Sequence, residues 1–194
     1  MLIGSTLVDM YATCGSLSDA YKVFDGLRIR NVVSWSIVIA RYQEHGNDER
    51  ALHLYENMRE EGIQADGFIF VSVLKACANL EALEKGKSTH AELTKVGLAA
   101  DMFVGSTLVD MYIKCGAIEE ARFVFDQQRK RDVATWKIMI LGYVDCECDK
   151  EALGLFQLMQ EEGIKPNSLT VTGLLNACAR LSSLNEGKFI HKFC

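Results

Sequence analysis

Apolar residues recur every three to four positions along this chain, and short polar turns interrupt them at regular points. The first such run has the spacing of one helical face and consists of Leu2, Ile3, Leu7, Met10 and Tyr11. Cys14-Gly15 is expected to end this helix. Ser16 and, three residues later, Asp19 have the spacing of a capping arrangement at the start of a second helix. Residues 1–31 therefore predict helix, turn, helix.

Two longer blocks continue this pattern. Residues 32–66 hold two periodic apolar runs separated by the break His45-Gly46-Asn47, and Gly62 ends the second run. Residues 67–101 hold two further runs and reach a glycine at Gly97. Each block therefore predicts a hairpin of two helices.

The three blocks then repeat. Residues 4–11 return unchanged as residues 105–112, and residues 1–93 share about 40 identities with residues 102–194 along their whole length. We place the repeats at 1–31, 32–66, 67–101, 102–132, 133–167 and 168–194, the last being incomplete by register, so that the chain is expected to end inside a helix. A hairpin of this size cannot bury both faces alone, whereas stacked copies share a continuous core. We expect an all-α solenoid of helix-turn-helix repeats in a single array.

Composition narrows the function classes. The chain is 49% hydrophobic and contains one proline, which fits a helix-rich folded chain without a flexible linker. Its apolar runs are too short for a membrane span, and its first residues do not resemble a targeting segment. The net charge of -5 argues against a broad basic surface for nucleic acid, so any nucleic-acid binding is expected to depend on local sites.

The cysteines follow the repeat. Cys14 is in register with Cys115, and Cys77 with Cys178, so we expect each pair to fill the same packing position as reduced, structural thiols.

Three chemical motifs fail on spacing. His90-Ala91-Glu92 lacks the downstream C-x-x-C of the zinc deaminases, and Cys146-x-Cys148 has no second metal pair. Gly86-Lys87-Ser88 lacks the earlier glycine of a phosphate-binding loop. We therefore expect no catalytic residue, no metal and no cofactor.

Specific residues resemble a known family. They are Val32-Val33-Ser34-Trp35, Leu74-Lys75-Ala76-Cys77-Ala78, Leu108-Val109-Asp110-Met111-Tyr112, Lys114-Cys115-Gly116 and Val124-Phe125-Asp126. Together with the alternation of 31 and 35 residues, they resemble plant pentatricopeptide repeat proteins of the PLS class, in the order S, P, L, S, P and partial L. The resemblance implies a right-handed superhelix, and a fragment without the E and DYW domains that some members carry.

The resemblance also implies binding of single-stranded RNA, with one base per repeat selected by the fifth and the last residue of that repeat. Ser5 with Asn31 resembles the adenine combination, whereas Ser36 with Asp66 and Ser106 with Asp132 resemble the guanine combination. The remaining positions depart from the pattern or lack a partner, and they are Val71 with Asp101, Lys137 with Asn167, and Thr172. Lys137 leaves two interpretations open, contact with a phosphate or carbonyl edge and relaxed constraint.

The second residue of each repeat is implied to stack on bases. These residues are Leu2, Val33, Phe68, Phe103, Ala134 and Leu169. Packing in the protein core is the alternative for Phe68 and Phe103.

Three function classes are compared: a sequence-selective RNA-binding module, a protein-binding helical scaffold, and an editing enzyme. A tetratricopeptide-type scaffold keeps a uniform 34-residue period, unlike this chain. An editing enzyme needs a catalytic domain that this sequence does not contain. We therefore expect a non-enzymatic RNA-binding module. The resemblance implies a role in organellar RNA processing, especially cytidine-to-uridine editing, in a mitochondrion or chloroplast. Editing-complex proteins would supply catalysis, and exposed repeat ends favour self-association.

Overall fold

The computed structural model describes residues 2–99 and 101–193, without the side chain of Leu2. Every regular element in these two ranges is helical, so the all-α prediction is confirmed. Among the described residues, no helix combines the length and the apolar character that crossing a membrane requires. The chain divides into two compact units, residues 1–99 and 100–194.

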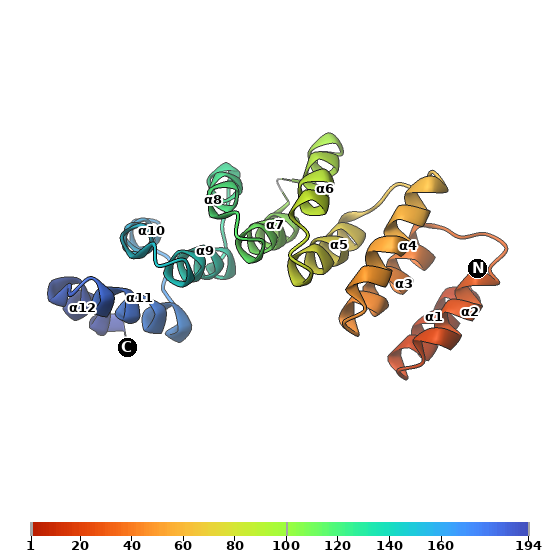
Figure 1. Ribbon diagram of the computed structural model, residues 1–194, viewed down its shortest axis with the longest axis horizontal. Coiled ribbons are helices and arrows are strands. Elements are labelled where there is room, and N and C mark those ends of the chain that lie inside the picture. The colour runs from red at the N-terminus through yellow and green to blue at the C-terminus, as the bar shows by residue number, and fades with distance from the viewer. Residues whose placement is uncertain (1, 100, 194) are drawn as a thin grey trace. The chain divides into compact units, whose positions relative to one another are not determined.

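The first unit contains three helical hairpins (Figure 1). Their helices are α1 (Leu2–Thr13), α2 (Leu17–Asp25), α3 (Val32–Glu44), α4 (Asp48–Glu60), α5 (Gly67–Asn79) and α6 (Leu83–Lys95). The first helices of neighbouring hairpins, α1, α3 and α5, pack against one another in sequence. Each of α2 and α4 contacts its own partner and the first helix of the next hairpin.

The second unit repeats this arrangement. Its helices are α7 (Met102–Lys114), α8 (Ile118–Gln127), α9 (Val133–Asp145), α10 (Asp149–Glu161), α11 (Ser168–Arg180) and α12 (Leu184–Ile190), followed by the short 3-10 helix η1 (His191–Phe193). The first helices α7, α9 and α11 again form one layer, and α8 and α10 each pack on two of them. The predicted hairpins are therefore present in both units.

Local chemistry explains most helix ends. Gly15 and Gly116, which are in register, have φ values of +81° and +72°, in the left-handed region that a side chain disfavours. The predicted capping arrangement at Ser16 is wrong in detail. Ser16 precedes α2 but bonds no backbone N–H, and its hydroxyl instead donates to the Asp19 carboxylate at 2.7 Å.

Aromatic side chains fill the same core position in both units. Phe24 packs edge-on against Trp35, with 4.7 Å between ring centroids, and Phe125 packs in the same way against Trp136 at 4.9 Å. All four rings are fully buried. Because these pairs join the second helix of one hairpin to the first helix of the next, they hold successive hairpins at a repeated spacing.

Candidate nucleic-acid interface

The last residue of every complete repeat caps the helix that begins the next repeat. These residues are Asn31 before α3, Asp66 before α5, Asp101 before α7, Asp132 before α9 and Asn167 before α11. The family resemblance assigned the same positions to base selection, and sequence reasoning missed their capping role. Asn or Asp directly before an apolar run is a recognised helix-start signal that could have identified it.

Capping engages only one polar atom of each side chain. The Asn31 Oδ1 accepts the Ser34 N–H at 3.0 Å, and the Asp66 Oδ1 accepts the Ile69 N–H at 2.9 Å. Asp101, Asp132 and Asn167 likewise accept backbone N–H groups through Oδ1. Within the described ranges, the second atom of these side chains forms no hydrogen bond to protein. An amide therefore leaves a donor, Nδ2, and a carboxylate leaves an acceptor, Oδ2.

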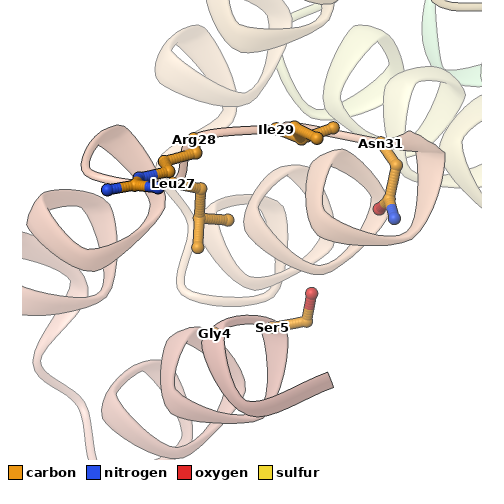
Figure 2. Close-up of a pocket in the computed structure, with 6 residues that line it drawn as sticks. All are labelled: Gly4, Ser5, Leu27, Arg28, Ile29 and Asn31. Carbon is orange, nitrogen blue, oxygen red and sulfur yellow. The ribbon is translucent and has the colours of Figure 1, made fainter. Parts of the chain in front are cut away.

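The first repeat brings its two predicted reading residues to one pocket. Ser5, in the first turn of α1, and the cap Asn31 both line an open pocket of about 210 Å³. Figure 2 shows their polar ends pointing toward one another across the opening. The other lining residues are Gly4, Leu27, Arg28 and Ile29. A hydroxyl and an amide that face one gap can bond the same planar edge.

The other fifth residues occupy the same turn of their helices. Ser36, Ser106 and Lys137 are half-buried, whereas Thr172 is exposed. Each of the three half-buried residues lies in a first helix that packs against the next first helix, and the last residue of the same repeat caps that next helix. Ser106 and Thr172 donate their hydroxyls to backbone carbonyls of Phe103 and Ser168 at 3.0 and 2.9 Å. Their oxygens therefore remain acceptors only.

The third predicted pair differs from the rest. Val71 is half-buried and has no polar side-chain atom, so it can supply no hydrogen bond to a base. It belongs to the first unit and Asp101 to the second.

The predicted stacking residues point away from the core. Phe68 and Phe103 are 79% and 75% exposed, so the core-packing alternative for them is wrong. Val33, Leu169 and Ala134 are exposed as well. The side chain of Leu2 lies outside the described residues. Exposed apolar residues that are scattered at random would not recur at the same position of successive repeats. Their recurrence at the second position favours contact with a flat ligand.

Ion pairs brace the loops that lead into two of the caps. Arg30 donates to Glu61 at 2.9 Å, and its guanidinium lies over the Phe24 ring. Its register counterpart Arg131 donates to Glu162 at the same distance and lies over Phe125. Each guanidinium thereby ties the loop to the following hairpin.

The cysteines only partly match their predicted positions. Cys77 and Cys178 are buried, as expected for packing residues. Cys14 is exposed and Cys115 half-buried, so a shared buried position for that pair is wrong. Both lie at the end of a first helix, where the turn exposes them to solvent. Among the described residues no cluster of three or more metal-ligating side chains occurs.

One face of α1 is apolar and exposed. Ile3, Leu7 and Met10 are 77%, 39% and 41% exposed, whereas their register counterparts Val104, Leu108 and Met111 are buried. Self-association through such a face stays a prediction.

Family models match most of the repeats found here. The PPR repeat model matches residues 5–32, 33–63 and 106–132, and the PPR repeat family model matches residues 131–180. The matched segments fall in both units.

Curated relatives from Arabidopsis thaliana extend this match over nearly the whole chain. The chloroplastic pentatricopeptide repeat-containing protein At4g18520 is 40% identical over 191 residues, which is 98% of this chain and 31% of the relative. The mitochondrial protein At3g09040 is 39% identical over 189 residues, 97% of this chain and 18% of that protein. The chain thus spans less than a third of the length of these relatives.

A solved structure shares the fold. Maize PPR10, in a complex with an 18-nt psaJ RNA element, superimposes with a TM-score of 0.73 at 19% identity. The match covers 97% of this chain and 29% of that one. With the repeat matches and the identity of about 40% to named pentatricopeptide repeat proteins, the chain belongs to the pentatricopeptide repeat family.

Proposed function

We propose that this chain binds single-stranded RNA sequence-selectively and reads one base with each repeat. The proposal is carried by the free polar atom of each cap and, in the first repeat, by the pocket that Ser5 and Asn31 share. A relative of this fold, maize PPR10, forms a complex with RNA. Helical repeats that present a few side chains to each unstacked base are an established mode of RNA recognition.

Capping provides a physical basis for purine choice. Asn31 uses Oδ1 for the helix, so only the Nδ2 donor is left, which suits the N1 acceptor of adenine. Asp66 and Asp132 leave a carboxylate oxygen, which suits the N1–H donor of guanine. The hydroxyls of Ser5, Ser36 and Ser106 would bond a second atom of the same base. The proposed preference is A, G, any base and G over the first four repeats.

The exposed second residues would hold each base in place. Phe68 and Phe103 offer open aromatic faces, and stacking on such faces tolerates every base. Selection would then come from the polar pair and affinity from the stack. This division suits a chain with a net charge of -5, which cannot depend on a broad basic surface.

The alternation of 31- and 35-residue repeats supports assignment to the PLS class. In that case the chain would select a site for organellar RNA processing such as cytidine-to-uridine editing, with catalysis supplied by partner proteins. Chloroplastic and mitochondrial relatives support an organellar location.

The test is a set of titrations with short single-stranded RNAs. RNA containing A, G, any base and G at consecutive positions is expected to bind more tightly than scrambled RNAs or the DNA analogue. Asn31→Asp should shift the preference at the first position from A toward G, because it replaces the free donor by an acceptor. The preference at the fourth position is the internal control. Equal binding of matched and scrambled RNA would refute the proposal and favour a protein-binding scaffold.

A further inference from the structure

Two caps are held by a second hydrogen bond from a buried hydroxyl. Thr135, the third residue of its repeat, donates both its N–H and its Oγ1–H to the Asp132 Oδ1, at 2.8 and 2.7 Å. Thr170 donates the same two groups to the Asn167 Oδ1, each at 2.9 Å. Both threonines are 0% exposed. These hydroxyls therefore serve the cap side chain and cannot reach a bound ligand.

Two donors on one oxygen restrict how the cap side chain can turn. The oxygen of Asp132 that faces Thr135 is held by the protein, so the other oxygen points outward in one orientation. In Asn167 the same contact also decides the amide orientation, because only Oδ1 can accept both donors. Nδ2 is then the atom presented to solvent. A reading group fixed before binding loses less conformational freedom when it bonds a base.

The other caps in the described ranges lack a bond from a hydroxyl, although the Asp101 Oδ1 accepts two backbone N–H groups. Ile69, the register counterpart of Thr170, donates only its N–H to the Asp66 Oδ1. Ser34, the register counterpart of Thr135, turns its hydroxyl to the backbone oxygen of Asn31 at 2.9 Å. Of the caps in the described ranges, Asp132 and Asn167 are those held through a third-residue hydroxyl. The chain therefore contains its own comparison between held and less restricted caps.

We propose that Thr135 and Thr170 are positioning residues for base selection, which they sharpen by fixing the free atom of Asp132 and Asn167. They act through the cap and do not touch RNA. The inference rests on the proposed RNA binding, and it identifies the third residue of a repeat as a determinant of how strictly that repeat selects its base.

The main test compares Thr135→Val with Thr135→Ser. Valine keeps the shape and the backbone N–H but removes the hydroxyl, whereas serine keeps the hydroxyl. Affinities are measured for RNAs that carry G or A at the position read by the fourth repeat. Thr135→Val is expected to lower the G-over-A preference about three- to tenfold. This range corresponds to the typical free-energy cost of immobilising one side chain, here Asp132, on binding. Thr135→Ser should retain the preference of the original protein.

The first repeat supplies the internal control, since its reading pair, Ser5 and Asn31, is far from Thr135 in sequence and belongs to the other unit. A purely structural role would weaken binding without changing the G-over-A ratio. A ratio unchanged by Thr135→Val, with selective binding by the original protein, would overturn the inference alone. Absence of base preference in the original protein would overturn the proposed function and the inference together.

A gain-of-selectivity variant keeps the test independent of losses in folding. Ile69→Thr places the residue of its register counterpart Thr170 next to Asp66, and it is expected to increase the G-over-A preference of the second repeat about three- to tenfold. Ile69→Val, which adds no hydroxyl, is the matched control. An equal ratio for both variants would contradict the positioning role.

Discussion

At the residue scale, one side chain can serve two purposes because its polar atoms are separate. The caps use Oδ1 to complete the N-terminus of a helix, where N–H groups would otherwise lack partners. The remaining atom is left at the surface, in a side chain that capping has already oriented. Removing the cap to test RNA binding would therefore also destabilise the helix. Asn31→Asp avoids this problem, because both residues are good caps.

The exposed aromatic residues allow a residue-scale test of stacking. Phe103→Ala is expected to weaken RNA binding by about 1–3 kcal/mol, the typical contribution of a base on an aromatic ring. The free energy of unfolding should change by less than about 0.5 kcal/mol, because the ring is 75% exposed. Titration and urea denaturation measure the two effects.

Phe123→Ala is the matched control for that change. Phe123 lies on α8 of the same hairpin and is 62% exposed, but it is not the second residue of a repeat. Its removal should leave RNA affinity unchanged. Similar losses for the two variants would mean that binding responds to general surface hydrophobicity and not to stacking at the predicted position.

At the element scale, small residues decide how closely first helices approach. A Cβ on Gly142 of α9 would lie 2.7 Å from Cδ1 of Ile113 and 3.0 Å from two more of its carbons. Ile113 belongs to α7, the neighbouring first helix of the same unit. Since a branched side chain cannot move away easily, Gly142 sets the spacing of the layer that carries the reading residues.

Gly142→Ala is therefore expected to reduce the free energy of unfolding by about 1–3 kcal/mol through overpacking. Gly154→Ala is the control within the same hairpin, because its Cβ would meet no atom within 4 Å. That change should stabilise the protein by about 0.5–1 kcal/mol, since alanine favours a helix. Urea denaturation measures both, and a loss of stability in Gly154→Ala would contradict the packing argument.

At the scale of the whole molecule, the two units repeat one fold but differ in one polar contact, a side-chain hydrogen bond to an Asp at the start of a second helix, which we call the clamp. In the second unit, Arg180 at the end of α11 donates Nε to Asp149 at 2.8 Å, and the guanidinium holds the pKa of Asp149 below its usual value of 3.8. In the first unit the register counterparts are Asn79 and Asp48. Here the uncharged amide of Asn79 donates to the Asp48 carboxylate at 3.0 Å. The donor partner of the carboxylate is therefore a guanidinium in the second unit and an amide in the first.

The Asp149 pair stabilises the folded protein above the unfolded pKa of about 4 and is lost as pH falls through the lower folded pKa. Arg180→Asn copies the amide donor of the first unit. Its melting temperature should lie below that of the original protein at pH 7, and the difference should shrink as pH falls through the folded pKa of Asp149, because the carboxyl group is then protonated. Thermal unfolding followed by circular dichroism measures this. A difference independent of pH would show that the ion pair does not titrate as proposed.

Sequence alone predicted the period, the hairpins and the family, because helix periodicity and cap residues are local signals that repeat in register. Ser5 and Asn31 could likewise be named, from the family resemblance together with the repeat boundaries. Their convergence on one pocket depended on the packing of α1 beside α3, which no local signal encodes.

Tertiary structure decided what each named side chain does. It exposed Phe68 and Phe103, which the sequence left open between core and surface, and it exposed Cys14 against expectation. Exposure depends on which helix covers a face, and equal residues in register can have different neighbours. Tertiary structure also directed the Thr135 hydroxyl to Asp132 and the Ser34 hydroxyl to the backbone. A hydroxyl rotates among nearby acceptors, so its partner follows from the folded geometry and not from residue type.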